Sequence, residues 1–169
     1  MSIQTHPLKE QLLSIKKHIP VFVGLSEDNI IHMISRIQFL RYQSSEIVIR
    51  QNELGPNMFY VLTGSLDIYM FDQNTPYIES MQDVGSDTLD SSHITTIEKK
   101  AVFGEIASIM GEKRSATVVT AEESHLLAFN LDKKYLSQHL DIQNILYKNI
   151  IHIMTDNLVK TNHIIKEIS

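Results

Sequence analysis

The spacing of hydrophobic residues along the chain changes twice and predicts three kinds of segment. In residues 1–37, apolar positions recur three or four residues apart, as on one face of a helix, and Ser26 stands where an N-cap belongs. From about residue 38 the spacing becomes two, which is typical of short strands. Helical spacing resumes after residue 130. We therefore expect N-terminal helices at 1–37, a β-roll at 38–130 and C-terminal helices at 131–169.

The predicted strands are short and separated by turn residues. This arrangement favours an antiparallel roll over a parallel α/β sheet. The expected fold is thus a single α+β domain over 1–169, with an antiparallel, jelly-roll-like β-roll (a double-stranded β-helix) flanked by helices. The strands are expected around residues 39, 47–49, 58–62, 66–70, 94–97, 118–119 and 126–129.

Residues 72–92 interrupt the strand pattern with a stretch that contains no Lys or Arg. A loop of this length inside a compact domain is uncommon. We expect a solvated insertion between two strands, with an interaction surface as the alternative. Its five acidic residues are Asp72, Glu79, Asp83, Asp87 and Asp90.

The amino-acid composition argues against several classes of function for this protein. The net charge of −5 gives none of the cationic excess of a nucleic-acid binder, and the absence of Cys excludes disulfides, thiolate metal sites and a Cys nucleophile. No apolar run approaches the roughly 18 residues of a spanning helix, and no secretory pattern opens the chain. We expect a cytoplasmic protein without a nucleic-acid or membrane partner.

Catalytic and metal-binding motifs are missing from the sequence as well. The eight histidines are scattered, without the spacing of a metal-ligand set, and no Gly-x-Ser-x-Gly, Walker loop or pair of catalytic carboxylates occurs. We therefore expect no enzyme activity, no metal and no cofactor, and neither a catalytic nor a DNA-binding domain.

The C-terminal helix carries apolar residues at alternating steps of three and four, which is the pattern of a heptad seam. Such a seam packs either on its own domain or against the same helix of a second copy, so a homodimer through this helix is one of the two expectations. The seam consists of Ile151, Met154, Leu158, Thr161, Ile165 and Ile168.

The segment 103–117, which reads FGEIASIMGEKRSAT, carries the chemistry. Gly104 permits a close backbone approach, and residues 105–110 are suited to a short helix whose first amides lack intrahelical partners and can face a phosphate. Arg114, expected on the following strand, can neutralise that phosphate with oriented hydrogen bonds. Glu105 is repelled by a phosphate, so it suits the hydroxyl of a ribose. Phosphate together with ribose indicates a nucleotide.

At these residues the sequence resembles the cyclic nucleotide-binding domain family, which includes the catabolite activator proteins and the regulatory subunits of cyclic-AMP-dependent protein kinase. The family's phosphate-binding cassette reads Phe-Gly-Glu-(Leu/Ile)-Ala, a short variable stretch, then Arg-(Ala/Ser/Thr)-Ala-Thr, and this chain matches it from Phe103 to Thr117. The resemblance covers most of residues 19–165. It implies a β-roll that holds a short phosphate-binding helix.

The resemblance also implies roles for individual residues. Glu105 would accept from the ribose 2′-hydroxyl, and Arg114 would pair with a phosphate oxygen. The hydroxyl and amide of Ser115 would add donors, and Ser at this position is compatible with cyclic AMP while leaving cyclic GMP open. The phosphate and ribose contacts would therefore come from Gly104, Glu105, Ile106, Ala107, Arg114 and Ser115.

The wall of the pocket follows from the same resemblance. Behind the ribose and base we expect Ile49, Ile68 and Ile94, with base contacts from Thr161 and Asn162 on the C-terminal helix. The chain departs from the family in two turns. Asn52 replaces a glycine but tolerates the left-handed conformation, so that turn should survive, and Lys99 and Lys100 stand in another turn where glycine is usual.

The function expected from the sequence is a regulatory sensor module that binds a cyclic nucleotide reversibly through the cassette at 103–117. Cyclic AMP is the expected ligand and cyclic GMP the alternative. The competing hypothesis is a dimerising scaffold or protein-interaction module with a degenerate pocket, motivated by Lys99, Lys100 and the long acidic insertion. In either case a downstream protein partner is implied, and the sequence does not identify it.

Overall fold

The computed structural model describes residues 8–72, 78–130 and 133–168, and the side chains among them except those of 8, 9, 133 and 160–168. Two compact units are present. The helical unit comprises residues 1–35 and 133–169, and the roll unit comprises residues 36–132. The single domain expected over 1–169 stays a prediction.

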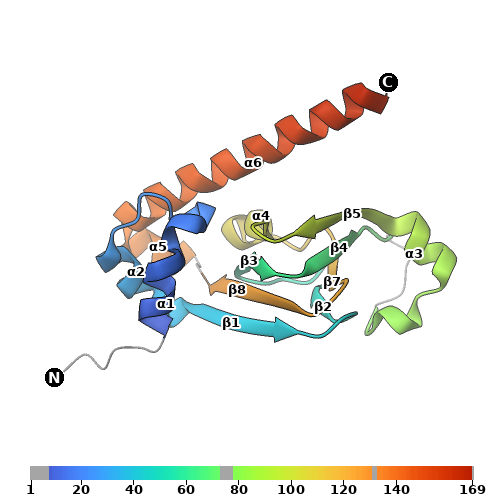
Figure 1. Cartoon of the computed structure of the whole chain (residues 1–169), viewed down its shortest axis with the longest axis horizontal. Helices are drawn as coiled ribbons and strands as arrows, with labels where there is room; N and C mark the ends of the chain where they lie inside the picture. The colour runs from blue at the N-terminus through green and yellow to red at the C-terminus, as the bar shows by residue number, and fades with distance from the viewer. Residues whose placement is uncertain (1–7, 73–77, 131–132, 169) are drawn as a thin grey trace. The chain divides into compact units, whose positions relative to one another are not determined.

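The roll unit contains two four-stranded antiparallel sheets, in the strand orders β1-β8-β3-β6 and β2-β7-β4-β5 (Figure 1). The expected antiparallel roll of the α+β class is thereby confirmed. The short strand β6 was not predicted, because two residues are too few to show a period. The strands are β1 (Ile37–Tyr42), β2 (Ile47–Ile49), β3 (Asn57–Thr63), β4 (Ser65–Tyr69), β5 (His93–Glu98), β6 (Val102–Phe103), β7 (Thr117–Thr120) and β8 (Ser124–Asn130).

The core of the roll is formed by the alternate apolar residues of these strands. The rings of Phe59 and Phe103 stack with centroids 5.1 Å apart, which ties β3 to β6. Each fully buried side chain of this size contributes about 1.5–3 kcal/mol to folding. The buried members are Ile49, Phe59, Val61, Leu66, Phe103, Val118, Leu126 and Ala128.

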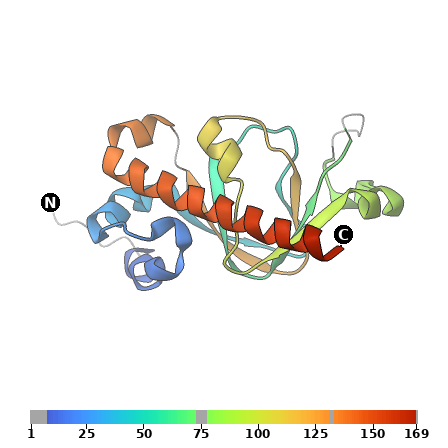
Figure 2. The ribbon, with the colours of Figure 1, turned by 90° about the horizontal axis from the view of Figure 1, so that it is seen from above.

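The helical unit is built from both ends of the chain. Ser26 caps α2 as expected, and Asn29 completes the capping box by accepting from the Ser26 amide. Asn149 donates to the carbonyls of Val21 and Val23, which joins α6 to the N-terminal segment. In the view from above, α6 is one continuous helix (Figure 2). The elements are α1 (Leu8–Ile15), η1 (Lys16–His18), η2 (Pro20–Phe22), α2 (Glu27–Met33), η3 (Ile34–Arg36), α5 (Lys133–Gln138) and α6 (Leu140–Ile168).

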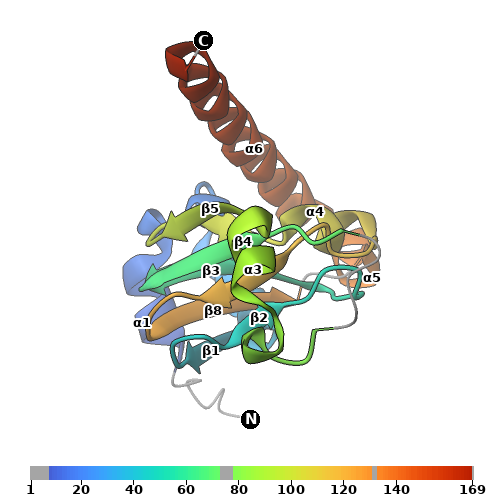
Figure 3. The same ribbon diagram turned by 90° about the vertical axis from the view of Figure 1, so that its right-hand side faces the viewer.

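The acidic insertion connects β4 to β5, as expected, but it is not a simple loop. It contains η4 (Met81–Asp83) and α3 (Ser86–Ser92), and α3 lies at the end of the roll that faces the viewer in Figure 3. The prediction missed α3 because its sequence, SDTLDSS, is poor in strong helix formers. All five acidic side chains are exposed.

Two turns of the roll have a left-handed residue that is not glycine. Asn52 has a φ of 68°, which confirms that the turn survives the replacement of glycine, and Lys100 has a φ of 76°. Lys100 also donates its amide to the carbonyl of Val61, so this turn retains a hydrogen bond to β3.

Two further results concern the described residues only. None of their helices combines the length and the apolar character needed to cross a bilayer. Nor do three or more of their His, Asp or Glu side chains gather in a way that suits a metal ion.

Candidate functional site

The short helix expected at 105–110 is present as α4 (Glu105–Met110). Gly104 precedes it in the left-handed conformation, with a φ of 72°, which explains why a glycine is needed there. Ala107 and Ser108 are buried, and the Ser108 hydroxyl donates to the carbonyl of Pro56 at 2.5 Å. The helix is thus anchored to the segment that precedes β3.

Arg114 lies before β7, and the prediction that it sits on a strand is wrong. Its main chain instead bonds to the turn after β2: the Arg114 amide donates to the carbonyl of Glu53, and the Asn52 amide donates to the carbonyl of Arg114, each at 2.9 Å. Next to these bonds, Leu54 and Lys113 form an isolated antiparallel β-bridge. The residue is fixed by this turn rather than by a sheet.

The side chain of Arg114 is buried, at 6% exposed, and points back to the start of α4. Its Nη1 donates to the carbonyl of Gly104 at 2.7 Å, and its Nη2 donates to the carbonyl of Asn57 at 2.6 Å. A guanidinium has five N–H groups in a fixed fork. Three of them therefore have no partner among the residues that the structure describes, and they remain available to an acceptor from outside the chain.

Glu105 supplies the opposite charge and is also buried, at 9% exposed. Burial raises the pKa of Glu105, while its own amide and the charge of Arg114 act in the other direction. Burial likewise lowers the pKa of Arg114, which the charge of Glu105 partly offsets. The site therefore holds one cation and one acid, both removed from water.

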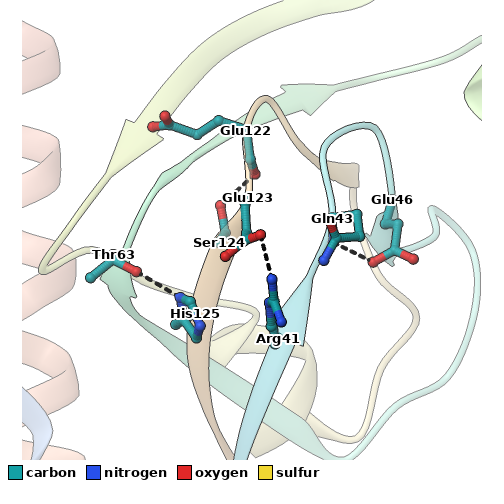
Figure 4. Close-up of polar contacts among 8 residues, drawn as sticks. All are labelled: Arg41, Gln43, Glu46, Thr63, Glu122, Glu123, Ser124 and His125. Carbon is teal, nitrogen blue, oxygen red and sulfur yellow. Dashed lines mark hydrogen bonds and ion pairs between the residues drawn. The ribbon is translucent and has the colours of Figure 1, made fainter.

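The setting of Arg114 differs from that of Arg41 on β1. Arg41 is exposed and pairs with Glu123 at 2.7 Å, within a network of polar side chains at the ends of β1, β3 and β8 (Figure 4). In that network Thr63 also contacts His125 at 3.0 Å. The guanidinium of Arg114 is buried and donates to two carbonyls beside the start of α4, a position that suits the binding of an external anion there.

The other residues predicted to contact the ligand differ in how deeply they are buried. Ile49 is buried beside the cassette, since a Cβ on Gly104 would lie 3.0 Å from its Cδ1, and Ile68 packs against the same core. Ile106 and Ser115 are exposed.

Ile94 does not join Ile49 and Ile68 in the roll core, and its expected contact with a ligand stays a prediction. It is 57% exposed on the edge strand β5, on which every residue except Ile97 is exposed. Thr161 and Asn162 lie on the described backbone of α6, but their side chains lie outside the described part of the chain.

Sequence reasoning missed the residues that hold Arg114. Glu53 and Asn57 act through main-chain carbonyls, which leave no signal in residue type. Gly55 acts through the absence of a side chain: a Cβ there would lie 2.9 Å from Nη2 of Arg114. The sequence shows that Gly55 stands in a turn, but it does not show that Arg114 packs against this glycine.

Comparison with known families agrees with this geometry. The model of the family described as "Cyclic nucleotide-binding domain" matches residues 39–135, which include the whole cassette. This chain belongs to the cyclic nucleotide-binding domain family. The expected resemblance is thereby confirmed.

Relatives of this cyclic nucleotide-binding domain are parts of larger proteins. A cGMP-dependent protein kinase from Plasmodium berghei is 29% identical over 66% of this chain and 11% of the kinase. A cAMP-dependent protein kinase regulatory subunit from Dictyostelium discoideum is 30% identical over 76% of this chain and 34% of that protein. The domain thus corresponds to a minor share of each relative.

Solved structures show the same fold. A cyclic nucleotide-binding domain from Methylobacillus flagellatus has a TM-score of 0.72 at 16% identity, covering 96% of this chain and 86% of that one. The catabolite activator protein of Thermus thermophilus has a TM-score of 0.60 at 17% identity, covering 88% of this chain and 62% of that one.

Proposed function

We propose that this domain is a regulatory sensor that binds cyclic AMP reversibly through residues 103–117. The observation that carries the proposal is the buried guanidinium of Arg114, which two carbonyls orient and which keeps three N–H groups for a ligand. A phosphate oxygen is the acceptor that best matches such a fork. The amides of Gly104, Ile106 and Ala107 would add donors at the same place.

The second charged group of the site, Glu105, indicates which group the ligand carries beside its phosphate. Glu105 is a buried carboxylate beside the cation, so it suits a ligand that presents a hydroxyl next to a phosphate. A ribose with a cyclised phosphate has this arrangement, and its single negative charge balances Arg114. A hydrogen bond to a charged group contributes about 1.5–3 kcal/mol. Since micromolar binding needs about 8 kcal/mol, amide contacts and base burial must supply the remainder.

The choice of cyclic AMP over cyclic GMP rests on Ser115. The names of the matched relatives include both cGMP-dependent kinases and cAMP-dependent kinase regulatory subunits, so they allow either purine. Ser115 is the residue that favours cyclic AMP by resemblance, and it is exposed beside the site. The pocket wall would include Ile49 and Ile68, with Thr161 and Asn162 reaching the base.

Output and location belong to the same proposal. A sensor signals only if its ligand binds one conformation more tightly than another. We place the protein in the cytoplasm, acting by ligand binding without catalysis and passing the signal to a protein partner. The seam residues Ile151, Met154 and Leu158 are exposed on the helical unit, which supports a homodimer through α6.

Thermal melts with added cyclic AMP, cyclic GMP and AMP test this function. Stabilisation by a cyclic nucleotide and a smaller effect of AMP are expected, since binding to the folded state raises its stability. A folded protein that responds to none of the three would contradict the sensor and favour the scaffold hypothesis.

A further inference from the structure

Residues 52–57 hold Arg114 through both its main chain and its side chain. The amide of Asn52 and the carbonyl of Glu53 bond to the main chain of Arg114, each at 2.9 Å. The carbonyl of Asn57 accepts from Nη2 of the same residue at 2.6 Å. Backbone and guanidinium are therefore oriented by one short segment, which lies about sixty positions earlier in the sequence.

Gly55 lies in the middle of this segment, directly against the guanidinium. A Cβ at Gly55 would lie 2.9 Å from Nη2, 3.3 Å from Nε and 3.4 Å from Cζ of Arg114. Real Cβ atoms essentially never approach another atom within 3.0 Å. Since the nearest atoms belong to the end of a flexible side chain, the guanidinium rather than the backbone would have to move.

The backbone at Gly55 does not itself require glycine. Gly24, Gly64, Gly104 and Gly111 have positive φ angles, and Gly55 is not among them. Alanine is thus compatible with the local conformation of Gly55, whereas at Gly104 it would combine strain at a φ of 72° with a contact to Nη1. The closest contacts of a methyl group at Gly55 would therefore be with Arg114.

We propose that Gly55 is a positioning residue, which keeps the guanidinium of Arg114 aimed at the ligand phosphate. The proposal rests on the proposed function for its consequence, since the phosphate is the ligand group concerned. The structural part of the proposal does not depend on a ligand. It states that the space left by the missing side chain of Gly55 determines where the guanidinium of Arg114 lies. The three atoms nearest to the added methyl group all belong to Arg114, so the displacement is expected to fall first on this side chain.

The experiment compares Gly55→Ala with Gly85→Ala. The matched control adds the same methyl group where no atom lies within 4 Å. Calorimetry should show cyclic AMP binding about tenfold weaker in Gly55→Ala and unchanged in Gly85→Ala, as expected for the loss of one charged hydrogen bond. In the unliganded protein, the Nε–H signal of Arg114 in a ¹⁵N NMR spectrum should shift in Gly55→Ala only. The sequence has four arginines, and Arg114→Ala identifies the signal.

The results separate this proposal from the proposed function. Unchanged affinity together with an unshifted Arg114 signal in Gly55→Ala overturns it. If the wild type binds neither cyclic AMP nor cyclic GMP, the proposed function fails, and the Nε–H signal alone decides whether Gly55 positions Arg114. If Gly55→Ala does not fold, the double variant Gly55→Ala/Arg114→Ala decides: recovered folding supports the proposal, and failure to fold contradicts it.

Discussion

Arg114 and Glu105 are opposite in charge and buried near one another, yet they do not form an ion pair within 4.0 Å. The guanidinium donates instead to the carbonyls of Gly104 and Asn57. Two charges that are held apart in this way remain available to a ligand. A phosphate and a neighbouring hydroxyl satisfy both at once, which is the chemical basis of the proposed cyclic nucleotide site.

Arg114→Ala should weaken cyclic AMP binding by about 10- to 150-fold, because it removes a charged hydrogen-bond donor worth about 1.5–3 kcal/mol. Calorimetric titration measures the change. Arg41→Ala is the control, since Arg41 is an exposed partner of Glu123 and such pairs contribute little. Equal losses in both variants would show that the effect is not local to the cassette.

Glu105→Gln should change how stability depends on pH. Burial raises the pKa of Glu105 above its ordinary value of 4.5, so the folded state keeps this proton to higher pH than the unfolded state does. The contribution of Glu105 to the free energy of unfolding therefore falls as pH rises from about 4.5 to the folded pKa, and is constant above it. Glutamine cannot titrate, so the variant lacks this fall.

Thermal melts between about pH 4 and pH 7 compare the Glu105→Gln variant with the wild type. Glu112→Gln makes the same change on an exposed side chain and serves as the control. Stability curves of Glu105→Gln and wild type that run parallel over this range would contradict the burial of an ionisable carboxyl group at this site.

Ser115→Thr should shift preference toward cyclic GMP by up to about tenfold, the effect of one neutral hydrogen bond of 0.5–1.5 kcal/mol. A β-branched side chain has fewer χ1 rotamers, which helps to fix the hydroxyl toward the exocyclic amine of guanine. Competition between the two cyclic nucleotides gives the ratio directly. A ratio unchanged in Ser115→Thr, with binding intact, would remove Ser115 as the source of purine preference.

Leu158→Glu should dissociate the proposed homodimer, because Leu158 is an exposed member of the α6 seam and a carboxylate there would be buried in the interface. Light scattering after size-exclusion chromatography reports the mass. His152→Glu places the same residue on α6 away from the seam and should leave the mass unchanged. A wild-type protein that is monomeric at high concentration would exclude this interface.

The sequence predicted the cassette well because its signals are local. Gly104 gives the turn and residues 105–110 give the helix, and the structure has both at the expected bounds. The strands of the roll followed from alternating apolar residues, as in β8. Asn52 kept its left-handed turn for the reason expected, since its short polar side chain tolerates a positive φ.

Features that depend on tertiary contacts were not predictable. Arg114 leaves the strand pattern because its main chain bonds to Asn52 and Glu53. Ile94 has the residue type of a core position, but it lies on β5, an edge strand whose residues other than Ile97 are exposed. Gly55 and Asn57 shape the site through a missing Cβ and a carbonyl, and neither is encoded in a pattern of side chains.

A crystal structure of the domain with cyclic AMP tests the central claim most directly. We expect a phosphate oxygen within hydrogen-bond distance of the Arg114 guanidinium and the ribose 2′-hydroxyl at the carboxylate of Glu105. Cyclic AMP bound elsewhere on the domain, with Arg114 contacting only the carbonyls of Gly104 and Asn57, would contradict the account.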